Sequence, residues 1–233
     1  MVNIKDTVIL VTGANGGLGS EFVHQALERG AAKVYAAART PRTWEDARVV
    51  PLTLDVTDQD SIGRAAAAAG DVAIVINNAG IYGASSLVDG PEDELRQQME
   101  TNFFGPIAIT RAFAPALRAA QGALVNIASV VSWLPIANAY STSKAALWSA
   151  TNALRLDLAQ TGVHVVGAYL SYTDTPMSQQ VREDANDPAD VVREILDGVE
   201  AGEDEVLADE TTRRVRAGLS GPIGALVAAV SGN

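Results

Sequence analysis

The fold is decided by the stretch Val8-Ile9-Leu10-Val11-Thr12-Gly13-Ala14-Asn15-Gly16-Gly17-Leu18-Gly19, near the amino terminus. Four apolar residues typical of a buried strand come first, and a glycine-rich turn, with Gly13, Gly17 and Gly19 at the spacing of a dinucleotide-binding motif, leads into a helical pattern. Glycine lets the backbone turn tightly, and the free amides at a helix start favour a phosphate group. The stretch therefore predicts a strand, an anion-binding turn and a helix from about Gly17 to Arg29. A turn without a ligand is the alternative.

Six short runs rich in β-branched residues recur along the chain, with helical patterns between them: Thr7 to Val11, Lys33 to Ala37, Val49 to Leu54, Val72 to Ile76, Ala123 to Ile127 and Val163 to Tyr169. Most are continuously apolar, as expected for parallel strands covered by helices on both faces. The pattern predicts an α/β fold with a doubly wound parallel sheet, the Rossmann fold. No linker or shift in composition divides residues 1–233 into a second domain.

Capping residues and helix-breaking residues indicate where the later helices begin and end. One is expected from near Thr57, with Thr57 as its cap. Glu92 to Ala120 should form two helices, because Pro106 lacks a backbone donor. The remaining elements expected are a helix over Ala139 to Gln160, a helix over Pro188 to Gly202, a short strand over Glu205 to Ala208 and a packed or dimer-facing tail at Ile223 to Val230.

Composition excludes several classes of function. Seventeen basic and twenty-eight acidic residues give a net charge of −11, which disfavours nucleic acid as a partner. With no cysteine and two histidines far apart in the chain, no metal site is expected. The amino terminus lacks the pattern of a secretory signal, and the longest late apolar run is far shorter than the roughly 20 residues that cross a bilayer. We therefore expect a cytoplasmic protein that does not bind a membrane.

The end of the second predicted strand bears on which dinucleotide would bind. It reads Ala37-Ala38-Arg39. An acidic residue at this position would bind the ribose 2′-hydroxyl of NAD, whereas a cation accommodates the 2′-phosphate of NADP. Arg39, with Thr40 and Arg42 close behind, favours NADP(H) over NAD, unless Arg39 is an ordinary exposed arginine. Asp55-Val56 is a candidate adenine contact, although Asp55 could instead cap the following loop.

A second group of residues suits proton transfer. Tyr140 and Lys144 are four apart, about one helical turn, so both side chains project from the same face. Ser129 lies eleven positions upstream. A free phenol has a pKa of about 10, and a nearby ammonium is expected to lower it.

In order and spacing, Thr12-Gly13-x-x-x-Gly17-x-Gly19, Asn77-Asn78-Ala79-Gly80, Asn102, Ser129 and Tyr140-x-x-x-Lys144 resemble the short-chain dehydrogenases/reductases. The resemblance implies that Tyr140 is the catalytic acid/base, Ser129 polarises the substrate oxygen and Lys144 lowers the pKa of Tyr140 and contacts the nicotinamide ribose. It also implies that Asn102 supports a water chain to Lys144. The cofactor contacts that it implies are Gly13, Asn15, Gly17, Leu18, Gly19, Asn77, Ala79, Gly80, Tyr140, Lys144, Thr173 and Thr175.

Two features depart from the family pattern. Ser129 precedes Tyr140 by eleven positions where about thirteen are common, and Ser132 and Ser141 are competing hydroxyls. Leu170-Ser171 stands where Pro-Gly is usual, which affects the expected nicotinamide contacts. Thr173 and Thr175 could therefore simply satisfy loop backbone.

The substrate loops are expected around residues 129–139 and 172–188. An apolar or aromatic ketone, aldehyde or alcohol suits the side chains expected to border them: Val131, Trp133, Leu134, Tyr82, Tyr172 and Met177. Trp133 could equally be a core or interface residue. The family resemblance implies a homodimer or homotetramer formed through Thr101 to Ala120 and Ala139 to Gln160.

The reaction expected is hydride transfer between a nicotinamide cofactor and a carbonyl compound. One alternative is a non-catalytic dinucleotide-binding redox sensor, which would have no chemical need for Ser129, Tyr140 and Lys144 together. Another is a lyase on the same scaffold, such as the related halohydrin dehalogenases, which replace the lysine and abandon the glycine turn. Lys144 and the turn are both present here.

Overall fold

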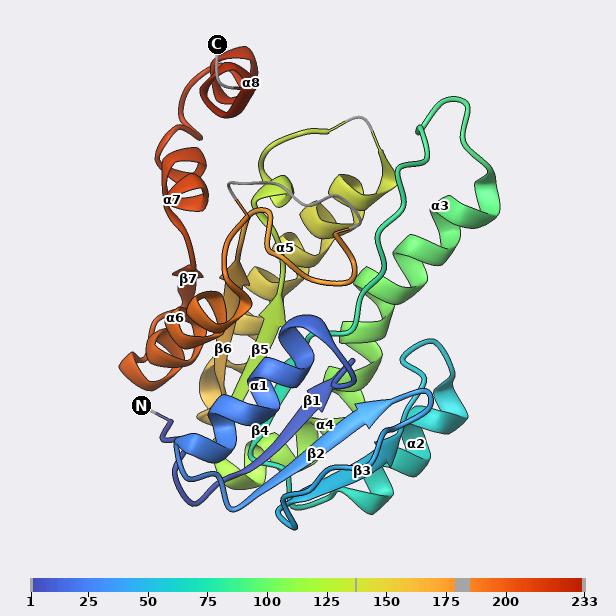
Figure 1. Cartoon of the computed structure of the whole chain (residues 1–233), viewed down its shortest axis with the longest axis vertical. Helices are drawn as coiled ribbons and strands as arrows, with labels where there is room; N and C mark the ends of the chain where they lie inside the picture. The colour runs from blue at the N-terminus through green and yellow to red at the C-terminus, as the bar shows by residue number, and fades with distance from the viewer. Residues whose placement is uncertain (1, 137, 179–184, 232–233) are drawn as a thin grey trace.

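The computed structural model describes residues 2–136, 138–178 and 185–231, with side chains as far as residue 227. Its centre is one parallel sheet in the order β3-β2-β1-β4-β5-β6-β7 (Figure 1). The predicted doubly wound sheet is confirmed, with ends displaced by one or two residues from the predicted ones. Its strands are β1 (Val8–Thr12), β2 (Lys33–Ala38), β3 (Val49–Thr53), β4 (Ile74–Asn77), β5 (Ala123–Ile127), β6 (His164–Tyr169) and β7 (Glu205–Leu207).

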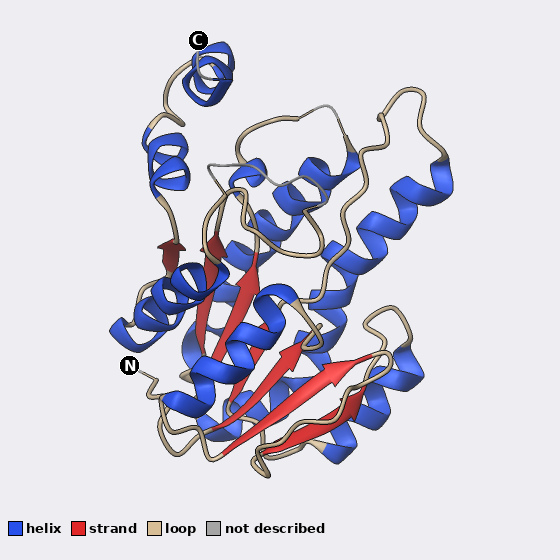
Figure 2. Cartoon of the chain, viewed as in Figure 1, coloured by secondary structure: helices blue, strands red, loops and turns tan. Residues whose placement is uncertain are grey.

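Helices cover both faces of the sheet (Figures 1 and 2). On one face α1 (Gly17–Glu28) packs beside α6 (Pro188–Ala201), and a continuous apolar core joins Phe22 and Ile195 to the strands. The core of the other face includes side chains from α2 (Gln59–Ala68), α4 (Gly105–Ala120) and α5 (Ala139–Leu158). Burial on both faces explains why the strands are apolar throughout.

The strand order reverses between β1 and β4, which are neighbours although β2 and β3 separate them in sequence. Ligands of such sheets bind at the carboxyl ends of the strands beside this reversal. The loops that follow β1, β2, β4 and β5 all reach this edge, and they carry most of the predicted site residues.

The long segment before β5 forms two consecutive α-helices, as predicted, and the second begins at Gly105. Between α3 (Glu92–Met99) and α4 lies a π-helical turn (Glu100–Phe104), which was not predicted. Pro106 explains the irregularity, because it has no N–H to donate to the carbonyl of Asn102 four residues earlier.

Two further differences concern helix starts. Asp58 rather than Thr57 caps α2, because its carboxylate accepts the Asp60 amide, while Thr57 bonds to Asp55. After β7 the chain forms α7 (Glu210–Ala217), which was not predicted, and α8 (Ile223–Ser231). Among the described residues no helix combines the length and the apolar composition that a membrane span requires.

Candidate active site

The glycine turn joins β1 to α1 and depends on close backbone contacts. Gly13 and Gly17 adopt positive φ angles of +68° and +52°, which favour glycine. A Cβ added at Gly19 would lie 2.1 Å from the carbonyl oxygen of Gly13. The turn therefore brings unobstructed backbone to the start of α1, as a pyrophosphate would need.

Asn78 and Thr12 hold this turn against the end of β4. The Thr12 hydroxyl accepts the amides of Asn78 and Ala79, both at 3.0 Å. The Asn78 amide group donates to the carbonyls of Thr12 at 2.9 Å and Gly13 at 3.3 Å. Sequence reasoning quoted Asn78 only as part of a motif, although a side-chain amide beside a glycine turn is suited to bridging its carbonyls.

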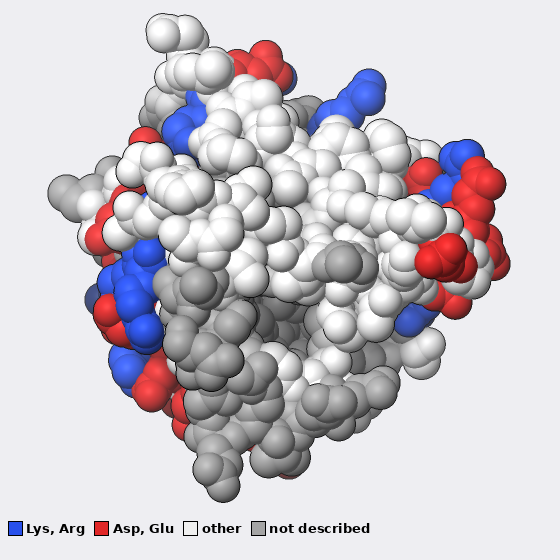
Figure 3. All heavy atoms as spheres, turned by 90° about the horizontal axis from the view of Figure 1, so that it is seen from above, with Lys and Arg blue, Asp and Glu red and all other residues white. Residues whose placement is uncertain are grey.

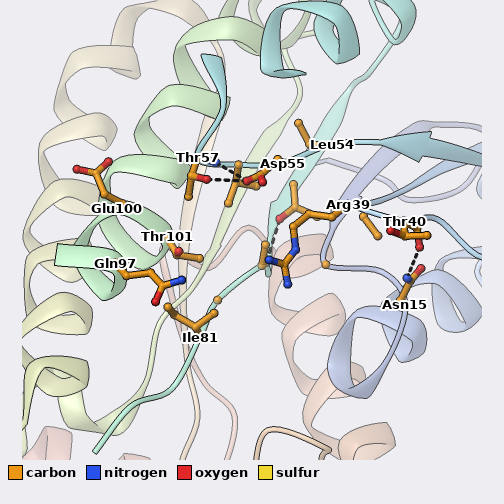
Figure 4. Close-up of a pocket in the computed structure, with 16 residues that line it drawn as sticks. Asn15, Arg39, Thr40, Leu54, Asp55, Thr57, Ile81, Gln97, Glu100 and Thr101 are labelled. Atoms are coloured by element: carbon orange, nitrogen blue, oxygen red, sulfur yellow. Dashed lines mark hydrogen bonds between the residues drawn. The ribbon is translucent and has the colours of Figure 1, made fainter. Parts of the chain in front are cut away.

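A cavity of about 570 Å³ opens beside the turn (Figure 4). Seven of the predicted cofactor residues line it: Gly13, Asn15, Arg39, Asp55, Val56, Ala79 and Gly80. Sequence reasoning missed the wall formed by Gln97, Glu100 and Thr101, because it had no reason to direct these helix residues towards the strand ends. The glycine turn and this cavity together fit a dinucleotide.

The two arginines after β2 are placed differently. Arg39 is exposed and reaches into the cavity (Figure 4). Arg42 stacks its guanidinium 3.9 Å from the centre of the Trp44 ring and does not line the cavity. Asn15 connects the loop to the glycine turn, because it donates to the Thr40 carbonyl at 2.7 Å and accepts the Arg42 amide at 3.3 Å. Arg39 is thus the better placed of the two for a phosphate in this cavity.

Asp55 is placed for both of the roles expected of it. It lines the cavity, where an adenine contact was predicted, and it also holds its own loop. Its carboxylate accepts the amide and hydroxyl of Thr57 at 2.9 and 2.7 Å. These bonds, and more weakly the positive charge of Arg39, lower the pKa of Asp55.

Ser129, Tyr140 and Lys144 lie together beyond the carboxyl end of β5. Asn138 caps α5 by accepting the Ser141 amide, and this places Tyr140 and Lys144 in the first turns of the helix. The Lys144 ammonium lies 5.7 Å from the centre of the Tyr140 ring and donates to the Ile127 carbonyl at 2.8 Å. Lys144 is 6% exposed, so the cation is buried beneath the phenol.

Burial controls the ionisation of both groups. It raises the pKa of Tyr140 to about 12, against the opposing effect of a hydrogen bond with Ser129. It also lowers the pKa of Lys144 to about 8. In the protein without nicotinamide, desolvation of the phenolate thus outweighs its hydrogen bond with Ser129. The expected lowering of the Tyr140 pKa, which also involved the positive charge of an oxidised nicotinamide, stays a prediction.

All three candidate serines donate to backbone carbonyls, Ser129 to that of Leu170 at 3.3 Å, so contact with Tyr140 is what distinguishes them. The Ser132 hydroxyl donates to the Lys144 carbonyl at 3.0 Å, and that of Ser141 donates to the Ile136 carbonyl at 2.7 Å. Ser129 is the serine that interacts with the Tyr140 phenol. The shortened loop therefore leaves Ser129 beside Tyr140.

Asn102 lies in the π-helical turn and is 1% exposed. Its amide nitrogen donates to the Ile81 carbonyl at 2.9 Å and to the Ser143 hydroxyl at 3.0 Å, while its oxygen accepts the Ile81 amide at 2.9 Å. The side chain thus ties the loop after β4 to α5.

Several residues predicted to contact the cofactor do not line the cavity beside the glycine turn. Asn77 is 3% exposed and bonds to Asn126 at 2.9 Å, so its side chain supports the sheet. The Thr173 hydroxyl donates to the Ser171 carbonyl, as the loop alternative required. Thr175 packs against Gly17, and Leu18 packs on the core under α1.

The comparisons agree with this geometry. The sequence model of one family, described as short chain dehydrogenase, matches residues 7–186. The chain belongs to this family. The resemblance seen in the motifs is thereby confirmed, and the short chain dehydrogenase core extends from the strand before the glycine turn to the loop before α6.

Two similar proteins illustrate the likeness. A solved structure of a short chain dehydrogenase from Burkholderia cenocepacia, in complex with NADP, has a TM-score of 0.91 and 35% identity, covering 98% of this chain and 99% of that chain. A curated protein of Schizosaccharomyces pombe, described as an NADPH-dependent 1-acyldihydroxyacetone phosphate reductase, is 35% identical over 168 residues. That match covers 67% of this chain and 56% of the relative, so the chain spans little more than half of the relative's length.

Proposed function

We propose that the protein is an NADP(H)-dependent oxidoreductase that interconverts a ketone or aldehyde and an alcohol, with Tyr140 as acid and base. The proposal is supported above all by the Tyr140 phenol, which interacts with Ser129 and has the buried Lys144 ammonium beneath it. When bound, the nicotinamide group supplies or accepts the hydride.

The protein's own residues handle the proton and the charge. Tyr140 gives its phenolic proton to the carbonyl oxygen in reduction and takes it back in oxidation. Ser129 donates a hydrogen bond to the same oxygen as negative charge develops there. Lowering the pKa of Tyr140 from about 12 to about 8 requires roughly 5 kcal/mol of preferential phenolate stabilisation. The Lys144 ammonium donates to the Ile127 carbonyl in this structure. When it turns from that carbonyl towards the phenol, its positive charge supplies part of this stabilisation.

The preference for NADP(H) rests on Arg39. It lies at the end of β2, exposed and lining the cavity, where a planar guanidinium can bind a 2′-phosphate. The two relatives described with NADP or NADPH agree with this choice.

An uncharged, apolar or aromatic carbonyl compound is the proposed substrate. The face beyond the carboxyl ends of the strands is hollowed, and the described residues around the hollow are uncharged, with charges gathered at its sides (Figure 3). Tyr82 stands edge-on to Tyr140, with ring centres 5.2 Å apart, and both Tyr82 and Met177 are exposed. Trp133 and Leu134, expected at the pocket border, are 8% exposed and pack in a core cluster with Tyr169.

A homodimer through α4 and α5 is also proposed. Phe104, at the end of the π-helical turn, is 49% exposed, and Leu156 on α5 is 80% exposed. Covering such side chains favours association. Light scattering should give twice the chain mass, and a monomer at micromolar concentration would contradict the assembly.

The function is tested with NADPH and a panel of ketones and aldehydes, by following the loss of NADPH absorbance. Wild type should turn over apolar or aromatic members, and Tyr140→Phe should lose this activity by about 10²- to 10⁴-fold while still binding NADPH. Unchanged turnover in Tyr140→Phe would remove this residue from the mechanism. No turnover of any carbonyl by wild type would overturn the proposed reaction.

A further inference from the structure

A buried carboxylate outside the proposed catalytic group lies at the start of α7. Asp209 is 6% exposed. Its carboxylate accepts the Thr212 amide at 2.8 Å, the Thr212 hydroxyl at 2.9 Å and the Ser171 amide at 2.6 Å. The two bonds to Thr212 cap α7, but the bond to Ser171 crosses to the loop after β6 and is not needed for the cap.

The Ser171 amide belongs to the same peptide group as the Leu170 carbonyl. On its other side, that carbonyl accepts the Val130 amide at 2.9 Å and the Ser129 hydroxyl at 3.3 Å. One rigid peptide unit thus stands between the Asp209 carboxylate and the Ser129 hydroxyl. This is the place where Leu170-Ser171 departs from the usual Pro-Gly.

We propose that Asp209 is a positioning residue for Ser129, acting through the Leu170–Ser171 peptide. The proposal rests on the proposed function, in which Ser129 bonds to the substrate oxygen. Asp209 fixes the rotation of the peptide. The Leu170 carbonyl in turn holds the Val130 amide and, until the Ser129 hydroxyl turns to the substrate oxygen, that hydroxyl as well, which keeps the Ser129 oxygen beside Tyr140. The same contacts make the docking of α7, which lies outside the matched family region, a determinant of the catalytic geometry.

The chemistry of the contact favours this role. All three groups that face Asp209 are donors, so the side chain acts only as an acceptor. A carboxylate that accepts a peptide N–H gives a short, strong hydrogen bond, and without it the buried amide would lose its partner. The peptide would then rotate to find another acceptor and displace the Leu170 carbonyl.

Two substitutions separate positioning from capping. In Asp209→Ser the hydroxyl still caps the Thr212 amide but is too short to reach Ser171 as well. Asp209→Asn keeps the shape of the side chain, but it has one carbonyl oxygen. That oxygen can cap the Thr212 amide or accept the Ser171 amide, whereas the carboxylate does both with its two oxygens. The matched control is Asp58→Ser, because the side-chain contacts of Asp58 among the described residues, a hydrogen bond from Asp60 and an ion pair with Arg64, stay within α2.

For Asp209→Ser and Asp209→Asn we expect kcat to fall about tenfold, since a displacement of about 1 Å in a catalytic group costs this much or more. KM for NADPH should change less than about twofold, because neither Asp209 nor the residues its side chain bonds to, Ser171 and Thr212, line the dinucleotide cavity. Asp58→Ser should retain wild-type kcat. A melting temperature above the assay temperature establishes that each variant is folded.

The decisive measurement is the same substitution in a Ser129→Ala background. If Asp209 acts through Ser129, Asp209→Ser should cause no further loss of kcat once the serine hydroxyl is gone. An equal tenfold loss in both backgrounds, or no loss in either, would overturn the inference while leaving the proposed function intact. Absence of turnover in wild type would instead refute the proposed function, and the positioning role with it.

Discussion

The contact between Gly19 and Gly13 makes Gly19→Ala a quantitative test of the glycine turn. A Cβ at this position would lie 2.1 Å from the Gly13 carbonyl oxygen and 2.8 Å from the Asn78 amide nitrogen, although real Cβ contacts below 3.0 Å essentially never occur. The first neighbour is backbone, so the start of α1 must move away from the turn by about 1 Å. Overpacking of this kind costs about 1–3 kcal/mol.

The same movement would separate the free amides of α1 from Gly13. We therefore expect NADPH binding to weaken about 10- to 100-fold, since a loss of about 1.4 kcal/mol is tenfold. Titration of NADPH fluorescence measures the affinity, and urea unfolding measures the stability. Gly63→Ala in α2 is the control, because nothing lies within 4 Å of its Cβ and alanine is the better helix former by about 1 kcal/mol. Wild-type affinity and stability in Gly19→Ala would refute the reasoning.

Three further substitutions test separate parts of the site. Arg39→Ala should weaken NADPH binding about 10- to 100-fold and leave NADH unchanged, because it removes a charge-assisted contact to phosphate; equal losses in titrations of both would exclude the phosphate role. Burial lowers the pKa of Lys144 from 10.5 to about 8, so the unfolded chain binds more protons than the folded chain between these pH values. The free energy of unfolding of wild type, relative to that of Lys144→Met, should therefore rise by about 2 kcal/mol from pH 8 to about pH 10. Parallel stability curves in urea would contradict this. Gln98 is 2% exposed, and neither polar atom of its side chain has a hydrogen-bond partner among the described residues. Gln98→Leu should therefore raise the free energy of unfolding by about 1–2 kcal/mol, and a lower free energy would indicate that a water is bonded to the wild-type side chain.

The sheet could be predicted because its determinants are local. Continuous apolar runs and the glycine turn at Gly13 to Gly19 depend on backbone geometry and burial, which leave a direct pattern in the sequence. The pairing of Tyr140 with Lys144 followed from helical spacing, and Ser129 joined them through the resemblance to the short-chain dehydrogenases/reductases. Gly105-Pro106 also indicated an irregular helix, although its form, a π-helical turn before Pro106, depends on which carbonyl loses its donor.

The contacts that could not be predicted join segments far apart in sequence. The sequence position of Arg42 suggested a phosphate ligand, but in the structure its guanidinium stacks on the Trp44 ring. The pKa of Tyr140 depends on how much protein surrounds the phenol, and spacing carries no measure of burial. Asp209 followed by Glu210 and Thr212 has the sequence of a helix cap, but its bond to Ser171 appears only when β6 and β7 lie side by side.

Isotope tracing tests the central claim most directly. Wild-type protein is given NADPH that carries deuterium at the transferable C4 position, together with the best ketone of the panel, and the alcohol is analysed by mass spectrometry and NMR. The account predicts one deuterium on the carbon that bears the new hydroxyl, with the hydroxyl proton drawn from solvent through Tyr140. An alcohol without deuterium at that carbon would contradict it.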